Sequence, residues 1–419
     1  MKNKRFSISL IPNLTFKDVL ISLKYLLIPW FWIYCRTGSY QKQAEDLLKN
    51  KLGLKYLFLV DKGRSALHLA LKALDIKKGD EVIIQAFTCV VVPNAILSRG
   101  AIPIYADIDP ETLNPGVEQI EKKITPKTKA ILVQHTFGYA PKIQAIQKLA
   151  QKHHLWLIED CAHCLGAKQG QVYLGHFGDI VIYSFGRDKV ISCVNGGAVA
   201  SNHLKLGRKL SQLMLDVSKP SYIFLLRSLL HSVCFYMALP WYGTRFKIGE
   251  GFILFLQKMA LLEKVYTPCE RQGSDKPPLP KKLANSLAEI LVHQLSLLDD
   301  FNEHRVKLAK LYYRELNDVA EIKHPPMDPR HIYFRYTIQV EDPQKLVNFV
   351  KLRGIYLGRW YKRVIVPLET DLETVKYAEG SCPCAEQVAK KVVNLPNHFH
   401  VKFKEARVLC EIIKDYYAG

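Results

Sequence analysis

The stretch Leu155-Trp156-Leu157-Ile158-Glu159-Asp160-Cys161-Ala162-His163, residues 155–163, decides the fold of this chain. It begins with a short apolar run that is typical of a buried strand, and the run ends in the carboxylate of Asp160. Open α/β sheets bind their ligands at the carboxyl ends of their strands, so Asp160 is a candidate ligand-binding residue. Two simpler interpretations stay open at this point: Asp160 caps the next helix, and His163 is a hydrogen-bonded structural histidine.

Similar apolar runs recur on both sides of this stretch and alternate with amphipathic ones. Apolar residues recur at helical spacing within 66–74 and again within 143–150. The alternation predicts an α/β fold with a mostly parallel sheet that is flanked by helices on both faces. Seven strands are expected, at Tyr56–Val60, Glu81–Phe87, Ile102–Ile108, Lys129–Phe137, Leu155–Asp160, Asp179–Phe185 and Gly197–Ser201.

A proline-rich segment, Ser274–Pro280, interrupts this alternation and predicts a domain boundary. We expect an N-terminal segment with an apolar helix at 1–50, a large domain at 51–280, and a long helix with a smaller α+β domain at 281–419. The length of the chain favours such a division. Within the last part we expect a helical stretch and two strands, at 283–316, 333–340 and 391–395.

The composition excludes several classes of protein. Of the 419 residues, 48% are hydrophobic and 23% are charged, which is the profile of an ordered globular protein. The formal net charge of +20 favours anionic partners. Because the basic residues are scattered and no nucleic-acid-binding motif is present, we expect no nucleic acid and favour a phosphorylated small substrate.

The ten cysteines predict reduced thiols in the cytoplasm, because no secretory signal is recognisable in this long chain. Cys161 and Cys164 form a CxxC pair around His163. No second pair stands at zinc-ribbon spacing, so we expect no metal site and expect the pair to fill space beside a strand.

Two apolar segments, 25–35 and 222–239, are either too short or too interrupted by ionisable groups to be clean membrane spans. We favour buried or dimer-facing helices for both. Peripheral association with the inner face of the membrane is the alternative, because aromatic and basic residues stand side by side there.

Two further loops follow predicted strands and carry residues that bind ligands. In residues 62–66, Lys-Gly-Arg-Ser-Ala, a strand gives way to a helix, whose free amides and dipole favour a phosphate. The alternative is a turn that needs its glycine for backbone reasons alone. Residues 183–189, Tyr-Ser-Phe-Gly-Arg-Asp-Lys, also follow a strand and end in Lys189. An isolated lysine is usually a solvated surface residue, so only its position makes Lys189 a candidate.

Taken in order, these segments resemble the DegT/StrS-type family of sugar aminotransferases, which depend on pyridoxal 5'-phosphate (PLP). The resemblance runs from about Tyr56 to the C-terminus. It is carried by Gly63-Arg64-Ser65-Ala66-Leu67, Gly79-Asp80-Glu81-Val82-Ile83, Thr125-Pro126-Lys127-Thr128-Lys129-Ala130-Ile131, Ile158-Glu159-Asp160-Cys161-Ala162-His163, Phe177-Gly178-Asp179, Ser184-Phe185 with Lys189, Gly196-Gly197-Ala198, Ala288-Glu289-Ile290 with Gln294-Leu295, and Pro383-Cys384-Ala385-Glu386 followed by Asn394-Leu395-Pro396.

The resemblance implies the fold-type I architecture of PLP transferases, with 51–280 as the PLP-binding domain. It implies transfer of an amino group from an amino acid, expected to be glutamate, to a keto-sugar, expected to be nucleotide-linked, in polysaccharide or glycan biosynthesis. It also implies a homodimer with its sites at the interface. Family members that dehydrate sugars have histidine in place of the lysine, so Lys189 argues against that branch.

Carried over position by position, Lys189 would hold the cofactor as a Schiff base and then act as the general base. Asp160 would pair with the pyridine nitrogen, and His163 would lie close to the ring. The phosphate contacts would come from Gly63, Arg64, Ser65 and Ser184.

This sequence departs from the family pattern at several positions. Cys89, a cofactor-binding residue by its position, replaces an aromatic that stacks on the ring, and Arg64 replaces a small hydroxyl residue. Lys281 or Lys282 would have to replace an asparagine that reaches the partner subunit's phosphate, and 204–272 is divergent. These departures leave an alternative function: a catalytically inactive, membrane-associated protein that keeps the PLP fold for binding or regulation.

Overall fold

The computed structural model describes residues 6–7, 12–242, 247–328 and 331–419. Of the expected N-terminal segment 1–50, residues 1–5 and 8–11 lie outside the described residues. Residues 243–246 of the divergent region also lie outside them.

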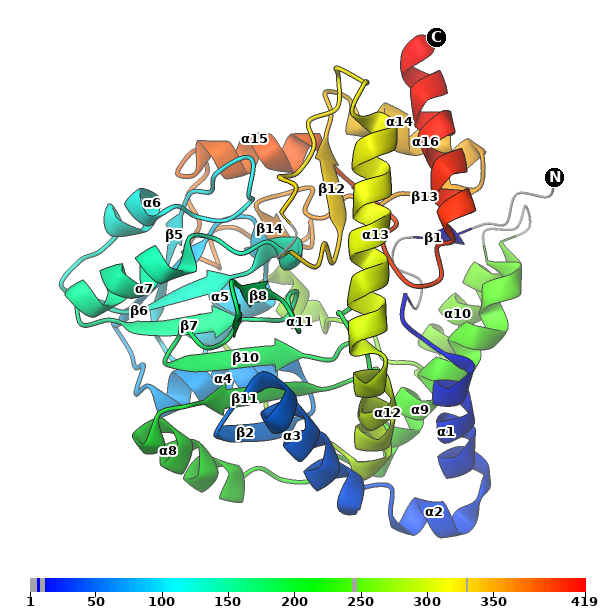
Figure 1. Cartoon of the computed structure of the whole chain (residues 1–419). Coiled ribbons are helices and arrows are strands. Elements are labelled where there is room, and N and C mark those ends of the chain that lie inside the picture. Colours follow the sequence, from blue (N-terminus) through cyan, green and yellow to red (C-terminus); the bar gives the residue numbers. More distant parts are fainter. Residues whose placement is uncertain (1–5, 8–11, 243–246, 329–330) are drawn as a thin grey trace.

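A seven-stranded sheet forms the centre of the molecule, as the sequence predicts (Figure 1). Its strands are β2 (Tyr56–Val60), β3 (Glu81–Gln85), β5 (Ile102–Ala106), β6 (Thr128–Gln134), β7 (Trp156–Asp160), β10 (Ile180–Ser184) and β11 (Gly197–Ser201). They lie in the order β2-β11-β10-β7-β6-β3-β5. Strand β11 is antiparallel to both neighbours, whereas β10, β7, β6, β3 and β5 run parallel. The mostly parallel α/β fold is therefore confirmed.

Each strand contributes side chains to two cores, because successive residues point to opposite faces of the sheet. In β6, Ala130 and Leu132 belong to one core, and Ile131 and Val133 belong to the other. The first face is covered by α4 (Gly63–Ala73) and α8 (Leu204–Leu215), and the second by α3 (Ser39–Leu52), α7 (Ile143–Lys152) and α12 (Asn285–Ser296). The helical spacing noted within 66–74 and 143–150 thus marks the buried stripes of α4 and α7.

The C-terminal part reaches back to the edge of the sheet at which the strands end. After α12, the helix α13 (Leu298–Leu316) completes the expected helical stretch, and β12 (Tyr336–Gln339) pairs with β15 (Val392–Leu395). The short strand β14 (Ile365–Val366) pairs in parallel with β4 (Thr88–Cys89), which brings C-terminal residues beside Cys89. The three-part domain division stays a prediction.

The remaining elements are short or lie at the periphery. They are β1 (Phe6–Ser7), α1 (Phe16–Leu27), α2 (Pro29–Ile33), α5 (Val91–Leu97), α6 (Val117–Glu121), η1 (Thr136–Gly138), β8 (Lys168–Gln169), β9 (Val172–Tyr173), α9 (Tyr222–Ala238), η2 (Leu239–Trp241), α10 (Ile248–Lys258), α11 (Pro268–Gln272), α14 (Pro343–Leu352), β13 (Ile355–Tyr356), α15 (Pro383–Lys391) and α16 (Phe403–Ala418).

The two apolar segments noted in the sequence form α2 with the end of α1, and α9. Helix α9 packs against α1 and α10 (Figure 1). Within the described part of the chain, one helical stretch, 222–241, is long and apolar enough to cross a membrane by length and composition alone, and 33% of its apolar window is buried. Tyr222, Ile223 and Met237 lie on its exposed side, whereas Ser228 and His231 face the protein.

Candidate active site

A cavity of about 470 Å³ lies at the carboxyl ends of the parallel strands β7 and β10. Most of the predicted site residues line it, although they come from distant parts of the sequence: Gly63, Arg64, Cys89, Asp160, His163, Ser184 and Lys189. Ser65 does not line the cavity. It is 2% exposed, and its hydroxyl bonds to Asp61 on the strand side of the turn.

Lys189, His163 and Asp160 form the centre of the cavity. The Lys189 Nζ lies 3.1 Å from the His163 Nε2. Burial, reinforced by the charges of Lys189 and Arg335, lowers the pKa of His163 well below its usual value. A neutral imidazole can accept a hydrogen bond from the lysine amine. His163 therefore orients Lys189 without placing a second positive charge beside it.

Asp160 ends β7, and its carboxylate accepts a hydrogen bond of 2.9 Å from the Ala162 amide. Burial raises the pKa of Asp160, while this amide and the charge of Lys189 act in the opposite direction. A buried carboxylate that lacks a full counter-charge is suited to a cationic N–H group of a ligand, such as a protonated pyridine nitrogen.

His163 is held between two aromatic rings. Its ring stacks on Phe137 at a centroid distance of 5.8 Å and on Phe334 at 5.0 Å. Phe137 follows β6 and has a positive φ of 53°. Phe334 comes from the C-terminal part of the chain. The two contacts fix the plane of the imidazole beside Lys189.

The loop that carries Lys189 is tied down at both ends. The Phe185 amide donates to the Gly196 carbonyl at 2.8 Å, and the Lys189 amide donates to the Gly186 carbonyl at 3.2 Å. The Asn13 side chain then donates to the Lys189 carbonyl at 2.5 Å. The backbone of Lys189 is therefore fixed while its amine faces the cavity.

The start of α4 forms the cationic end of the cavity. A Cβ added to Gly63 would lie 2.8 Å from the Ser184 Cβ, so only glycine lets the helix start approach the end of β10 this closely. Lys62 and Arg64 flank this glycine. The helix dipole and these two cations make the position suitable for a phosphate group.

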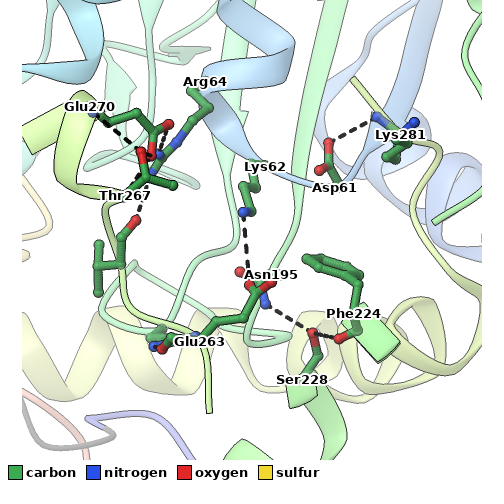
Figure 2. Close-up of polar contacts among 12 residues, drawn as sticks. Asp61, Lys62, Arg64, Asn195, Phe224, Ser228, Glu263, Thr267, Glu270 and Lys281 are labelled. Atoms are coloured by element: carbon green, nitrogen blue, oxygen red, sulfur yellow. Dashed lines mark hydrogen bonds and ion pairs between the residues drawn. The ribbon is translucent and has the colours of Figure 1, made fainter. Parts of the chain in front are cut away.

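These cations already have carboxylate partners (Figure 2). The Arg64 Nη1 pairs with Glu270, and its Nη2 donates to the Val265 carbonyl at 2.8 Å. The Lys62 Nζ lies 3.8 Å from Glu263. Arg64 was expected to contact a phosphate directly. In this structure its guanidinium holds Val265 and, within α11, Glu270.

Lys281, one of the two lysines expected to replace a family asparagine, is held within its own chain. Its amide donates to the Asp61 carboxylate at 3.1 Å, as Figure 2 shows, and its Nζ donates to the Ser218 hydroxyl at 2.7 Å.

Two polar groups near the cavity have unused hydrogen-bond donors, which suit a ligand that carries acceptors. Gln134 Nε2 and His163 Nδ1 are buried and have no hydrogen-bond partner among the described residues. Gln134 lines the cavity at the end of β6. An anionic ring compound with a basic ring nitrogen, such as the PLP expected from the sequence, fits the cationic start of α4 and the carboxylate of Asp160.

Sequence reasoning missed several residues that line this cavity. Arg335 pairs with Asp188 at 3.2 Å, and its guanidinium lies 3.8 Å from the centroid of the Trp360 ring. Tyr266 lies beside Cys89. Arg335 stands in the predicted strand 333–340 and Tyr266 in the region 204–272, so no local signal marks either residue.

The CxxC pair lies beneath the cavity, in the second core. Ligand atoms of His135, Cys161 and Cys164 lie within 4.8 Å of one another. However, His135 Nε2 is 2.9 Å from Glu159, and burial raises the pKa of the Cys161 thiol well above its usual value. Buried neutral thiols pack as small apolar groups, and all ten cysteines are free.

Comparisons with known proteins identify the family and the fold of this chain. The model of the DegT/DnrJ/EryC1/StrS aminotransferase family matches residues 32–221 and 262–414. GDP-perosamine synthase of Escherichia coli O157:H7 is 29% identical over 391 residues, which cover 92% of each chain. A pleiotropic regulatory protein of Geobacillus stearothermophilus is 29% identical over 385 residues, 91% of this chain and 90% of that one. The crystal structure of NtdA from Bacillus subtilis with bound cofactor PMP has a TM-score of 0.75 at 24% identity, covers 99% of this chain and 86% of that one, and shows the same fold.

Proposed function

This chain belongs to the DegT/DnrJ/EryC1/StrS aminotransferase family, and on that basis we propose that it aminates a keto group of a nucleotide-linked sugar. The donor in this proposal is an amino acid, with glutamate expected, and the product serves polysaccharide or glycan biosynthesis. The observation that carries the proposal is the placement of Lys189, His163 and Asp160 in one cavity. The relative named GDP-perosamine synthase supports a nucleotide-sugar substrate.

The proposal includes PLP as the cofactor, with Lys189 as its covalent attachment point. The start of α4 and the Ser184 hydroxyl would bind the phosphate, and Asp160 would bind the ring nitrogen. When bound, PLP supplies a carbonyl that accepts the amino group and a ring that withdraws electrons from the substrate carbon.

The residues of the chain then have separate tasks. Lys189 moves the proton between substrate carbon and nitrogen, because its amine is the flexible base beside the reacting atoms. Neutral His163 accepts a hydrogen bond from that amine and holds it in place. Phe137 and Tyr361 line the cavity and exclude water from this end of it, since each is nearly fully buried.

A substrate panel tests the proposed function. Purified protein with PLP and glutamate would be offered GDP-, UDP- and dTDP-linked keto-sugars, and amino-sugar formation would be measured by mass spectrometry together with 2-oxoglutarate release. We expect one molecule of each product per turnover with at least one sugar. Release of 2-oxoglutarate without amination of any sugar would overturn the nucleotide-sugar assignment.

Asp160→Asn is expected to retain the cofactor but to slow amino transfer by about 100-fold or more. Asparagine is neutral, so it cannot keep the ring nitrogen protonated, and the electron-withdrawing power of the ring falls. The glutamate half-reaction, followed by the visible absorbance of the cofactor in a single turnover, measures this effect.

Asp179→Asn is the matched control. The Asp179 carboxylate accepts from the Leu157 amide at 2.8 Å, close to the opposite end of the same strands, so this variant should react at nearly the rate of the wild type. A fast Asp160→Asn half-reaction would contradict the assigned role.

The catalytically inactive alternative is set aside, because family membership makes the chain an aminotransferase. We retain two further parts of the expectation as proposals. The enzyme acts in the cytoplasm as a homodimer, and light scattering would test the dimer. Exposed apolar residues of α9 such as Ile223 and Met237 support contact with the membrane's inner face. Sedimentation with anionic vesicles would test that contact.

A further inference from the structure

The segment that leads into α11, together with α11 itself, forms a cap on the cavity and is held by residues that line the cavity. We call residues 262–272 the cap segment. The family model leaves 222–261 unmatched but matches the cap segment, so of the region 204–272 that was expected to be divergent only 222–261 falls outside the match. Arg64 binds the cap segment at two points, the Val265 carbonyl and the Glu270 carboxylate, and Arg187 donates to the Glu263 carbonyl at 2.7 Å. Tyr266 lies between these anchors in the sequence, and Figure 2 shows the contacts that Arg64 makes with the segment.

The cap segment is also fixed internally and from the side. Thr267 caps α11 by accepting from the Glu270 amide at 3.2 Å, while the Glu270 carboxylate accepts from the Thr267 amide at 2.9 Å. The Asn94 side chain donates to the Glu270 carbonyl at 2.9 Å. These contacts leave the backbone on either side of Tyr266 little freedom, so its ring is held at the cavity.

Tyr266 lines the cavity on the side of Cys89. Its hydroxyl lies 3.2 Å from the Cys89 Sγ, and the guanidinium of Arg64 lies 5.6 Å from the centroid of its ring. Cys89 and burial raise the pKa of Tyr266 well above its usual value, so the hydroxyl stays neutral. The small Cys89 side chain leaves room for the Tyr266 hydroxyl to reach it.

Among the aromatic side chains that line the cavity, Tyr266 and Trp360 have no aromatic ring partner among the described residues. Phe137 stacks on His163, and Phe235 stacks on His231 at 4.1 Å. Tyr361 packs edge-on against Phe87 at 5.2 Å. The indole of Trp360 is covered by Arg335.

We propose that Tyr266 is a cofactor-contacting residue: the cap segment of the same chain places its ring against the cofactor ring, where the small Cys89 provides no aromatic surface. This inference rests on the proposed function, because it assumes PLP in this cavity. The aromatic contact contributes to cofactor affinity and fixes the tilt of the cofactor ring relative to Lys189.

Two readouts test the proposal without relying on turnover: the PLP dissociation constant and the circular dichroism of the bound cofactor's visible band. Tyr266→Ala is expected to weaken PLP binding by up to about tenfold and to change the dichroic band, because an offset ring contact contributes as much as about 1.5 kcal/mol. Tyr266→Phe keeps the ring and is expected to bind PLP within about twofold of the wild type.

A double variant provides the sharper test. In Cys89→Tyr alone the new ring would meet Tyr266, whose hydroxyl lies 3.2 Å from the present sulfur, so PLP binding should weaken. In Cys89→Tyr/Tyr266→Ala the new ring takes the vacated space and should restore affinity and the dichroic band. Cys89→Tyr would then lower PLP affinity when Tyr266 is present and raise it when Tyr266 is absent. Such a reversal identifies two residues that share one position against the ligand.

Tyr236→Ala serves as the matched control, since this exposed ring on α9 contacts Phe16 away from the cavity. It should bind PLP like the wild type. Wild-type affinity and dichroism in a folded Tyr266→Ala, or no rescue by the double variant, would overturn the inference and leave the proposed function standing. No PLP binding by the wild type would overturn both.

Discussion

Lys189→Ala is expected to abolish covalent cofactor attachment and to slow amino transfer by at least about 1,000-fold. The Lys189 Nζ is the amine that faces both His163 and the Asp160 end of the cavity, and alanine offers no substitute for either the attachment or the proton transfer. Borohydride treatment followed by peptide mass spectrometry measures the attachment. In the wild type the reduced cofactor should be found on the peptide that contains Lys189.

Two other lysines line the same cavity and provide the controls. Lys62 lies near Glu263, and Lys264 belongs to the cap segment. In Lys264→Ala the reduced cofactor should still be found on Lys189. If Lys189→Ala retained a borohydride-fixed cofactor on Lys62 or Lys264, the assignment of Lys189 would be wrong.

The central sheet could be predicted from the sequence because its strands are buried on both faces. For β2 and β11 the predicted ends agree with the structure, at Tyr56–Val60 and Gly197–Ser201. The strands predicted for β3 and β6 were too long at their carboxyl ends, which lie at Gln85 and Gln134 in the structure. Phe87 and Phe137 continue the apolar runs, but both have positive φ and turn into the core and the site instead of extending the ladder.

The site could be predicted in part for the same reason. Asp160 and Ser184 end parallel strands, and Lys189 and Gly63 lie in the short segments that follow strands, so local patterns place them at one edge of the sheet. Tyr266 and Arg335 reach the cavity by long-range packing, through ion pairs that no local pattern reveals. The approach of the cap segment depends on Arg64, for which the sequence predicted only a phosphate contact that departs from the family pattern.

A buried ion pair between Glu159 and His135 lies beneath the cavity and contributes to the stability of the fold. Glu159, with no exposed surface, lies 2.9 Å from His135 Nε2 and accepts from the Gly175, Phe177 and Gly178 amides at 2.9, 2.7 and 2.6 Å. Burial alone would raise the pKa of Glu159, but His135 and these amides lower it. Burial alone would lower the pKa of His135, but Cys161 and Glu159 raise it to about 10.

Glu159→Gln is expected to lower the free energy of unfolding by about 3–5 kcal/mol, because it leaves His135 buried without its counter-charge. Urea unfolding measures the loss. Glu121→Gln is the matched control, since it removes an exposed pair with Lys152 and should cost about 1 kcal/mol or less. Equal losses in the two variants would contradict the buried charge pair.

The pH dependence of this loss gives an independent check on the charges. The contribution of Glu159, with its lowered pKa, is present above its unfolded pKa of about 4.5 and is lost as the pH falls through the folded value. The contribution of His135, with its raised pKa, is fully present below its unfolded pKa of about 6.5 and is lost as the pH rises toward 10. The stability difference between wild type and Glu159→Gln should therefore be largest between about pH 4.5 and 6.5 and should shrink on both sides. A difference that does not vary with pH would mean that Glu159 acts through its hydrogen bonds to the three amides and not through its charge.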